Sequence, residues 1–531
     1  MNRQIDALIV GAGFAGLYAL YKLRQIGIVA HAFETADDVG GVWYWNRYPG
    51  ARCDVESLQY SYSFSDDLQQ EWDRTERFAR QPEILAYLRH VADRFDLRRS
   101  ISFGTSIVSA VFDDRAQCWH VRDSKGDDIV ARYCIMASGS LSASRLPDLP
   151  GIEDFAGPVL HTGAWPDHAP DFAGKNVAVI GTGSSGVQAI PQIASRAKAL
   201  FVFQRTPNFV IPARNQPLAA ESLAECKAEY PALRARAKQV GTLYDFSETL
   251  AFAVGAEARA AEYRRRWEQG GVNFVHAFKD IMTDLAANQT AADFVHARIR
   301  ETVDDPVTAE QLCPKDYPLG AKRICVGADY YETYNRSNVT LVDLQATPIV
   351  QVGAQTIQTS AATVPIDLIV CATGYDALTG ALARIDIRGR GGASLTDKWA
   401  AGPRNYLGLM CADFPNMFII TGPGSPSVLV NMVVGIEQHV DWIADCILHL
   451  EASGAAAIVP EAAAEAGWVQ RVNDEAALTL FPKANSWYLG ANIPGKPRVF
   501  MPFVGGIGRY RAICDQVAAE GYSGFEISSG D

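Results

Sequence analysis

The chain has 531 residues, 48% of them hydrophobic and 20% charged, with a formal net charge of −12. A globular chain of this length is too long for one ordinary core and indicates two or three domains. The acidic balance argues against nucleic acid as a partner, and no apolar run is long enough to cross a bilayer. The sequence enters a strand almost at once, with no signal peptide, so we expect a cytoplasmic protein without a membrane partner.

The ten cysteines and nine histidines are scattered along the chain. No two cysteines form a C-x-x-C pair, which argues against both a disulfide framework and a redox-active dithiol. The histidines lack the spacing of metal ligands. We therefore predict reduced thiols and no metal.

A glycine fingerprint opens the first predicted nucleotide-binding unit. A strand-like run at 6–10 leads into the sequence GAGFAG at 11–16 and then into a helix-like stretch. The first glycine permits the tight turn, the second lets a pyrophosphate approach, and the third packs helix on strand. The strand at 28–33 ends at Glu34, whose carboxylate suits a ribose with free hydroxyls, so FAD fits here. The cofactor residues assigned to this turn are Gly11, Gly13, Phe14, Ala15 and Gly16.

The first unit continues with a helix that starts near 81–85 and with strand-like pieces between 101 and 121. It ends at the apolar run 133–139, which predicts a buried strand stopped by small residues. A linker that begins and ends with proline, 147–150, follows.

A second fingerprint, GTGSSG at 181–186, follows a strand-like run at 176–180. The next strand, 199–204, ends at Arg205, and a guanidinium beside Thr206 suits the 2′-phosphate of NADP. Alternatively, Glu34 and Arg205 are ordinary exposed charges at strand ends. The residues assigned to NADP in this turn are Gly181, Thr182, Gly183, Ser184, Ser185 and Gly186.

The composition changes after the second unit has begun. From about 217 to 316 it is rich in Ala, Glu, Arg and Leu without strand signals, which indicates a helical insertion. Strand-like runs return at 338–343 and 367–374. We predict an α/β fold with two Rossmann-like dinucleotide-binding domains: an FAD domain at 1–144 and 380–531, an NADP domain at 145–216 and 335–379, and a helical insertion at 217–334.

The segment before the second fingerprint carries a further motif, formed by Phe155, Gly157, His161 and Trp165. It resembles the fingerprint of Baeyer–Villiger monooxygenases, whereas related flavin-containing monooxygenases end the motif with Tyr or Phe. The resemblance extends over nearly the whole chain and is closest to the phenylacetone and steroid monooxygenase branch. Its other motifs are GVWYWNRYPGARCD at 41–54, AKR at 321–323, YYETYN at 330–335, ATGYD at 372–376 and SWYLGAN at 486–492.

The resemblance implies an enzyme that uses NADPH and O2 to convert ketones to esters or lactones, with sulfoxidation as a side activity. In this family a flavin C4a-peroxide attacks the ketone and gives a tetrahedral (Criegee) adduct. That peroxide must stay deprotonated, which requires a fixed cation beside it. Arginine serves because it does not give up its proton at working pH.

By similarity the cation is Arg323, and Asp54 is the acid that positions it. The same cation can stabilise the oxyanion of the tetrahedral adduct. Alternatively, Arg323 belongs to a surface dibasic pair with Lys322, and Asp54 is a turn or N-cap residue. The cofactor-binding set implied by the resemblance is completed by Gly41, Val42, Trp43, Asp54, Tyr60, Lys322 and Trp487.

The resemblance also assigns roles around the cofactors. Lys322 is expected to reach the 2′-phosphate, and Trp487 to bond the nicotinamide ribose when the loop 485–496 closes as a lid. Trp487 could instead be a core residue. We interpret His161 as a structural histidine of the linker and Trp165 as packing at a joint between moving domains.

The loop 422–432 resembles the one that lines the ketone site. The expected substrate is a small apolar or aromatic ketone, together with O2, and we expect a monomer. Three alternatives remain open: a heteroatom-oxidising flavin-containing monooxygenase, an NADPH–flavin reductase, and a nucleotide-sensing module. The candidate pocket residues are Ser140, Ser427, Val428, Leu429 and Met432.

Overall fold

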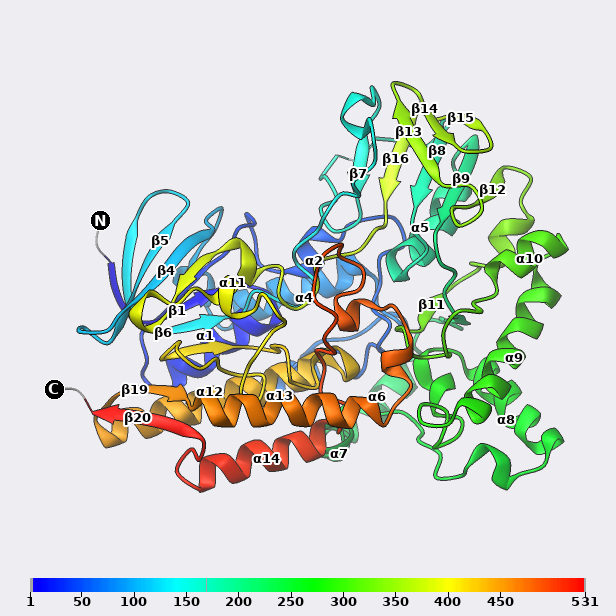
Figure 1. Cartoon of the computed structure of the whole chain (residues 1–531). Coiled ribbons are helices and arrows are strands. Elements are labelled where there is room, and N and C mark those ends of the chain that lie inside the picture. The colour runs from blue at the N-terminus through cyan, green and yellow to red at the C-terminus, as the bar shows by residue number, and fades with distance from the viewer. Residues whose placement is uncertain (1–2, 169, 530–531) are drawn as a thin grey trace.

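Each glycine fingerprint lies at the carboxyl edge of its own sheet in the computed structural model, which describes residues 3–168 and 170–529 (Figure 1). We call the two bodies built on these sheets the first and second units. Both follow the predicted order of strand, glycine turn and helix, so the predicted α/β fold with two Rossmann-like units is confirmed.

The sheet of the first unit has the order β17-β4-β5-β6-β1-β2-β3, and β18 also pairs with β6. The central strands β6, β1, β2 and β3 are parallel, whereas β4, β5 and β6 form an antiparallel meander. Strands after residue 380 therefore complete a sheet that begins at the N-terminus. The bounds are β1 Arg3–Val10, β2 Ala30–Phe33, β3 Ile101–Ser102, β4 Ile107–Asp113, β5 Cys118–Asp123, β6 Asp128–Met136, β17 Asp386–Arg388 and β18 Met417–Ile419.

The sheet of the second unit is parallel throughout, with the order β12-β9-β8-β16-β7. Its central strands are apolar along their length because helices and the small sheet β13-β14-β15 cover both faces. The bounds are β7 Val159–His161, β8 Asn176–Ile180, β9 Ala199–Gln204, β12 Val339–Asp343, β13 Ile349–Gly353, β14 Thr356–Thr359, β15 Thr363–Pro365 and β16 Leu368–Cys371. Two further pairs are β10 Val210–Pro212 with β11 Cys325–Gly327, and β19 Ala455–Pro460 with β20 Phe525–Ser529.

Helices cover both sheets (Figure 1). The fingerprint helices are α1 Phe14–Gln25 and α5 Ser184–Ala194, and α1 packs on the long helix α12 Met432–Ser453. The others are α2 Val42–Trp45, α3 Asp66–Glu71, α4 Gln81–Arg94, α6 Ala220–Ala228, α7 Tyr230–Val240, α8 Ala256–Gln269, α9 Leu285–Thr302, α10 Pro306–Leu312, α11 Leu395–Lys398, α13 Ala462–Ala477 and α14 Ile507–Ala519. Among the described residues, no helix is long and apolar enough to cross a membrane.

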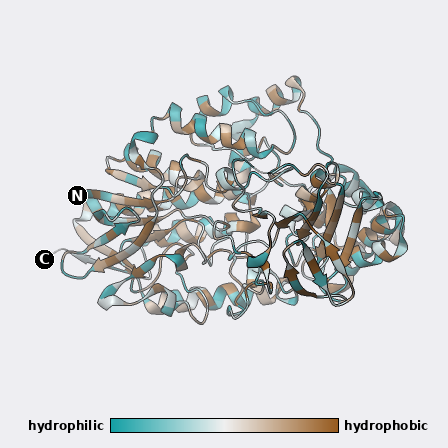
Figure 2. Cartoon of the chain, turned by 90° about the horizontal axis from the view of Figure 1, so that it is seen from above, coloured by the Kyte–Doolittle hydropathy of each residue, from teal (hydrophilic) through white to brown (hydrophobic). Residues whose placement is uncertain are grey.

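The two units have separate cores. Hydrophobic residues gather on the strands of both, and hydrophilic residues on the outer helices (Figure 2). The boundary between the cores passes through one short segment: Tyr48 and Ala51 pack into the core of the second unit, whereas Cys53 and Val55 pack into that of the first.

The helical insertion is divided between the two units, which the sequence does not indicate. Helices α8, α9 and α10 pack into the core of the second unit. Helix α7 instead packs on α14 of the first unit (Figure 1). There the guanidinium of Arg234, a buried group, donates to Gln69 Oε1 at 2.9 Å, to the carbonyl of Gln59 at 3.1 Å and to Ser61 Oγ at 2.7 Å. The insertion also contains β11, whose three residues are too few for a strand pattern.

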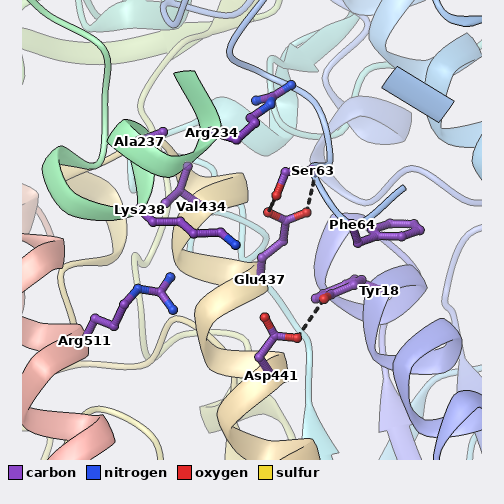
Figure 3. A pocket seen from close by; sticks show the side chains of 10 residues that line it. All are labelled: Tyr18, Ser63, Phe64, Arg234, Ala237, Lys238, Val434, Glu437, Asp441 and Arg511. Atoms are coloured by element: carbon purple, nitrogen blue, oxygen red, sulfur yellow. Dashed lines mark hydrogen bonds between the residues drawn. The ribbon is translucent and has the colours of Figure 1, made fainter. Parts of the chain in front are cut away.

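Polar contacts join α12 to the rest of the first unit around a small cavity of about 70 Å³ (Figure 3). The carboxylate of Glu437 accepts from the backbone N–H of Ser63 at 2.6 Å and from its hydroxyl at 2.5 Å. Tyr18 of α1 donates to Asp441 at 2.7 Å. Burial raises the pKa of Glu437 and the two bonds from Ser63 lower it, with a net rise.

Candidate functional site

The first glycine turn requires residues without side chains. Gly11 has φ +104°, and a Cβ there would stand 2.6 Å from the carbonyl oxygen of Ala137. A Cβ on Gly13 would meet the backbone of Gly41 at 3.3 Å, so two chain segments approach each other at this edge of the sheet. Only residues without side chains allow that approach. The turn therefore leaves the N-terminus of α1 accessible to a phosphate.

Glu34 stands at the end of β2, against the same turn. Its carboxylate is buried and accepts the backbone N–H of Ala12 at 2.7 Å and that of Ala36 at 2.9 Å. Burial raises the pKa of Glu34 and the two N–H groups lower it, with a net rise. These bonds fix the carboxylate while leaving it acceptor capacity for a ribose diol.

Aromatic residues surround the predicted flavin side. Trp43 donates its indole N–H to the hydroxyl of Tyr60 at 3.1 Å, and the ring of Tyr60 lies edge-on to that of Phe14 at 5.2 Å. Gly41 and Val42 start the short helix α2 that carries Trp43. The structure thus brings Phe14, Val42, Trp43 and Tyr60 to one place, as the sequence predicts for cofactor residues.

The second glycine turn repeats the first. Gly181 has φ +105°, and a Cβ there would lie 2.5 Å from the carbonyl oxygen of Ala372. Among the described residues, no atom lies within 4 Å of a Cβ built on Gly183, so space stays open where a pyrophosphate would lie. Thr182 donates to the carbonyl of Thr206 at 3.2 Å, which ties the turn to the end of β9. Ser184, Ser185 and Gly186 form the first turn of α5.

Two cations lie together beside this turn. Arg205 is exposed at the end of β9, and Lys322 is partly buried with its ammonium 4.5 Å from the ring centre of Tyr317. Burial and the neighbouring charge of Arg205 lower the pKa of Lys322 to about 8. Two positive charges this close repel each other unless an anion lies between them, which fits the phosphate of NADP.

Asp54 and Arg323 form a bidentate ion pair. The guanidinium donates from Nε to one carboxylate oxygen at 2.7 Å and from Nη2 to the other at 2.8 Å. Its Nη1 donates to the carbonyl of Val428 at 2.8 Å. Arg323 is therefore no surface dibasic residue: its orientation is fixed by the acid and by the candidate substrate loop.

Each member of this pair keeps its partner charged. Burial alone would raise the pKa of Asp54, but the charge and hydrogen bonds of Arg323 outweigh it and lower that pKa below its usual range. Burial would lower the pKa of Arg323, but Asp54 raises it well above the ordinary value. The guanidinium is thus a permanent, oriented cation.

The candidate substrate loop and the predicted lid meet beside Arg323. The helical turn η8 Ser427–Leu429 and the turn η10 Trp487–Leu489 share one apolar cluster. Figure 1 shows the orange-red segment around η10 between the two units. The cluster consists of Val428, Ala476, Tyr488, Leu489 and Phe500, with Leu429, Met432, Phe481, Trp487 and Val504 at its edge. Trp487 is half-buried there, not a core residue.

The lid is docked on the chain that follows the second unit. Lys496 forms an ion pair with Asp376, and the amide of Asn492 donates to the carbonyl of Tyr375 at 2.8 Å. Both partners belong to the segment 372–376, which follows β16. The loop 485–496 is therefore held against this segment, and its role as a mobile lid remains a prediction.

Ser427 lies in the loop 422–432, and Ser140 contacts the residue that precedes this loop. Ser427 is buried, has φ +30°, and its hydroxyl has no hydrogen-bond partner among the described residues. Ser140 is buried with its hydroxyl 3.5 Å from that of Thr421, which precedes the loop. Thr421 is held by His439, whose Nδ1 accepts its backbone N–H at 2.9 Å. Burial lowers the pKa of His439 to about 3, so this histidine is a neutral support of the loop.

The residues of the 155–165 motif pack in the second unit, and Trp165 also bonds to the first. His161 accepts the N–H of Gly163 on Nδ1 at 2.9 Å, and burial lowers its pKa. Trp165 is buried and donates its backbone N–H to Trp45 of the first unit at 3.1 Å. A Cβ on Gly157 would overlap the carbonyl of Asp367 and the ring of Phe155. All four are packing positions, and the hinge role remains a prediction.

Two tyrosines near the ion pair were not identified from the sequence. The charges of Asp54 and Arg323 affect the pKa of both Tyr244 and Tyr488, although burial is the main reason that both values are raised. Tyr488 directly follows Trp487 within the SWYLGAN motif, but the resemblance assigned it no role. Tyr244 lies in the segment between α7 and α8, with no motif around it.

Comparisons with known proteins identify relatives over nearly the whole length of the chain. A family model described as Flavin-binding monooxygenase-like matches residues 4–217. A Baeyer-Villiger monooxygenase of Pseudooceanicola batsensis is 43% identical and covers 98% of this chain and 96% of its own. An acetone monooxygenase (methyl acetate-forming) of Gordonia sp. is 40% identical, with 99% of each chain covered. The structure of an oxidized steroid monooxygenase bound to NADP is 53% identical, covers 99% of this chain and 100% of its own, and superposes with a TM-score of 0.95.

Proposed function

The chain belongs to the Baeyer–Villiger monooxygenases, and from this premise we propose that Asp54 and Arg323 are the catalytic pair with which it converts ketones to esters or lactones. The enzyme is an NADPH- and O2-dependent flavoprotein. Bound FAD, reduced by NADPH, supplies the oxygen-activating chemistry. The observation that supports the assignment is the bidentate pair, held between the two units and bonded to the loop beside the candidate ketone site.

The residues of both turns fit their cofactors. Glu34 presents a fixed carboxylate where the ribose of FAD would lie, and the glycine turn at 11–16 leads into the N-terminus of α1, where a pyrophosphate would bind. In the second unit the open space at Gly183 would admit the pyrophosphate of NADP, and Arg205 and Lys322 would hold its 2′-phosphate. This arrangement supports a preference for NADPH over NADH.

Arg323 would act in two ways. Its permanent charge favours deprotonated, anionic groups at its side, because arginine does not donate a proton at working pH. When a ketone carbonyl carbon is attacked, its oxygen gains negative charge, and an oriented guanidinium stabilises that oxygen without reorganising. Asp54 would keep the guanidinium in this orientation. Removing one such preorganised donor typically costs on the order of 100- to 1,000-fold in kcat.

We further propose a small apolar or aromatic ketone as substrate. Val428, Leu429 and Met432 offer apolar contacts beside Arg323. The buried hydroxyl of Ser427, which has no hydrogen-bond partner among the described residues, is a candidate to orient a carbonyl. Both turns, the ion pair and the lid come from one chain, so we also propose that a monomer carries the activity. Sedimentation velocity of the FAD-loaded protein tests that state; a stable dimer would contradict it.

The decisive experiment compares Arg323→Ala with the wild type in air, with NADPH and phenylacetone, and identifies products by mass spectrometry. The wild type is expected to form an ester one oxygen heavier than the ketone. The variant is expected to bind FAD and oxidise NADPH but form no ester, because the oriented cation is gone. Arg336→Ala, at an exposed arginine, is the matched control and should retain the ester yield. A normal ester yield from Arg323→Ala would show that the cation is wrongly assigned.

A further inference from the structure

The side-chain amide of Gln188, on the fingerprint helix α5, binds the backbone of Arg52. Its Oε1 accepts the N–H of Arg52 at 3.3 Å, and its Nε2 donates to the carbonyl of Arg52 at 3.1 Å. The hydroxyl of Tyr48 donates to the same Oε1 at 2.8 Å. Gln188 lies two residues beyond the last glycine of the second fingerprint. Arg52 lies two residues before Asp54.

The opposite edge of this segment is bound to the first unit. The N–H of Cys53 donates to the carbonyl of Ala79 at 3.1 Å, and the carbonyl of Ala51 accepts the N–H of Gln81 at 2.9 Å. These bonds form an antiparallel bridge in which the N–H and C=O of Arg52 point the other way. The amide of Gln188 satisfies both groups, in the way that a neighbouring strand would.

Close packing reinforces the contact. Gly50 has φ +85°, and a Cβ there would overlap the carbonyl oxygen of Gln188 itself. Tyr48 and Ala51 belong to the hydrophobic core of the second unit, although they precede the fingerprint of that unit by about 130 residues. The segment 48–52 is therefore attached to α5 by backbone proximity, core packing and three hydrogen bonds.

Arg323 is anchored to the same helix. Two residues beyond it, the thiol of Cys325 lies 3.6 Å from the hydroxyl of Ser184 at the start of α5. A Cβ on Gly327 would stand 2.9 Å from Cγ1 of Val187, so β11 also packs directly on α5. One helix, which begins in the predicted pyrophosphate turn, thus supports both members of the ion pair.

We infer that Gln188 is a positioning residue that couples the NADP-binding helix α5 to the Asp54–Arg323 pair. Through Gln188, the segment that carries Asp54 moves together with the second unit and Arg323 when the units shift. The bidentate bonds between Asp54 and Arg323 are therefore kept during the shift. The inference rests on the proposed function for its effect on ester formation. It rests on geometry alone for its effect on the segment 48–54.

The test uses the FAD-loaded protein and Gln188→Met, which keeps the length and helix propensity of the side chain but removes both polar groups. Gln192→Met is the matched control, because Gln192 lies one turn further along α5 and is exposed. Hydrogen–deuterium exchange of the peptide 48–54 is measured with and without NADP⁺. Gln188→Met should exchange about tenfold faster than the wild type in the NADP⁺ complex, since about 1.4 kcal/mol of hydrogen bonding is lost. Gln192→Met should match the wild type.

Steady-state kinetics supply the second readout. Gln188→Met should lower the ester formed per NADPH consumed about tenfold, while KM for NADPH and Kd for NADP⁺ stay within twofold. A residue that merely stabilises α5 would instead raise KM and Kd. If Gln188→Met loses FAD, Gln188→Asn, whose amide is one methylene too short to reach, takes its place.

Either of two results would overturn the inference. In the first, Gln188→Met matches the wild type both in the exchange of the peptide 48–54 and in ester yield. In the second, its ester yield falls only in proportion to its loss of NADP⁺ affinity. Absence of ester from the wild type would refute the proposed function instead, and the exchange measurement would still decide whether Gln188 positions the segment.

Discussion

Replacing Asp54 with Ala tests the ion pair from the side of its acid. The substitution removes two charge-assisted hydrogen bonds, of 2.7 and 2.8 Å, and leaves the guanidinium its bond to the carbonyl of Val428. Such bonds contribute about 1.5–3 kcal/mol each. The lower end applies, because the side chains of Asp54 and Arg323 are 19% and 26% exposed and water can replace part of the contact.

The expected loss is about 2–3 kcal/mol, which corresponds to about a 30- to 150-fold fall in the rate of ester formation if the orientation of Arg323 matters in the transition state. The assay is gas chromatography of the ester, with NADPH oxidation recorded in parallel and FAD content measured by absorbance. NADPH oxidation should continue and yield hydrogen peroxide. Asp73→Ala, at an aspartate whose side chain is 73% exposed, controls for the loss of a carboxylate in an ion pair. An Asp54→Ala variant that holds FAD and forms ester within threefold of the wild type would refute the reasoning.

Further predictions concern NADP, the lid and the linker. Arg205→Ala should raise KM for NADPH about tenfold or more and change KM for NADH little; equal effects on both would remove the phosphate assignment. Because the pKa of Lys322 in the free enzyme is lowered to about 8, its charge is present below that pH and lost above it. The affinity for NADP⁺, measured by fluorescence titration, should therefore weaken as pH rises through about 8, and Lys322→Met should flatten that dependence; an unchanged profile would contradict the role. Lys496→Ala removes the ion pair with Asp376 that docks the predicted lid. Kd for NADP⁺ should rise severalfold while FAD is retained. An unchanged Kd would show that this ion pair does not hold the lid. Trp165→Tyr should slow turnover without changing the product from ester to sulfoxide, and a clean switch to sulfoxidation would argue against the hinge role.

The two nucleotide units could be predicted because their signals are local. In each, an apolar strand, a glycine turn and a charged residue at the end of the next strand lie within about 30 residues, and the backbone alone dictates their arrangement. Glu34 and Arg205 were predicted in this way.

The arrangement around the ion pair depends instead on distant parts of the chain. The bond from Arg323 to Val428 joins residues 105 apart in sequence, and that from Gln188 to Arg52 joins residues 136 apart. Hydrogen bonds between side chains and a distant backbone leave no pattern in the sequence. Family resemblance could therefore name Asp54 and Arg323, but not the bonds to Val428 and Gln188 that hold their segments in place. The buried guanidinium of Arg234 likewise places α7 on the first unit, although the composition of α7 indicates that it belongs to the helical insertion.

The connection from α7 to α8 limits how the two units can move. Its start is bound to the first unit, where the hydroxyl of Thr242 accepts the N–H of Asn431 at 3.1 Å. Further along, the N–H of Ser247 donates to the carbonyl of His276 in the second unit at 3.2 Å. The crossing lies between adjacent residues: the carbonyl of Tyr244 accepts from Arg236 of α7 at 3.3 Å, and the carbonyl of Asp245 accepts from Arg266 of α8 at 2.5 Å. A chain this short acts as a pivot, and displacement about a pivot grows with distance from it. Tyr244 lies at this crossing, and the charges of Asp54 and Arg323 act on its hydroxyl. A swing of the units about this point would carry the proposed catalytic pair least and the outer rims of both sheets farthest.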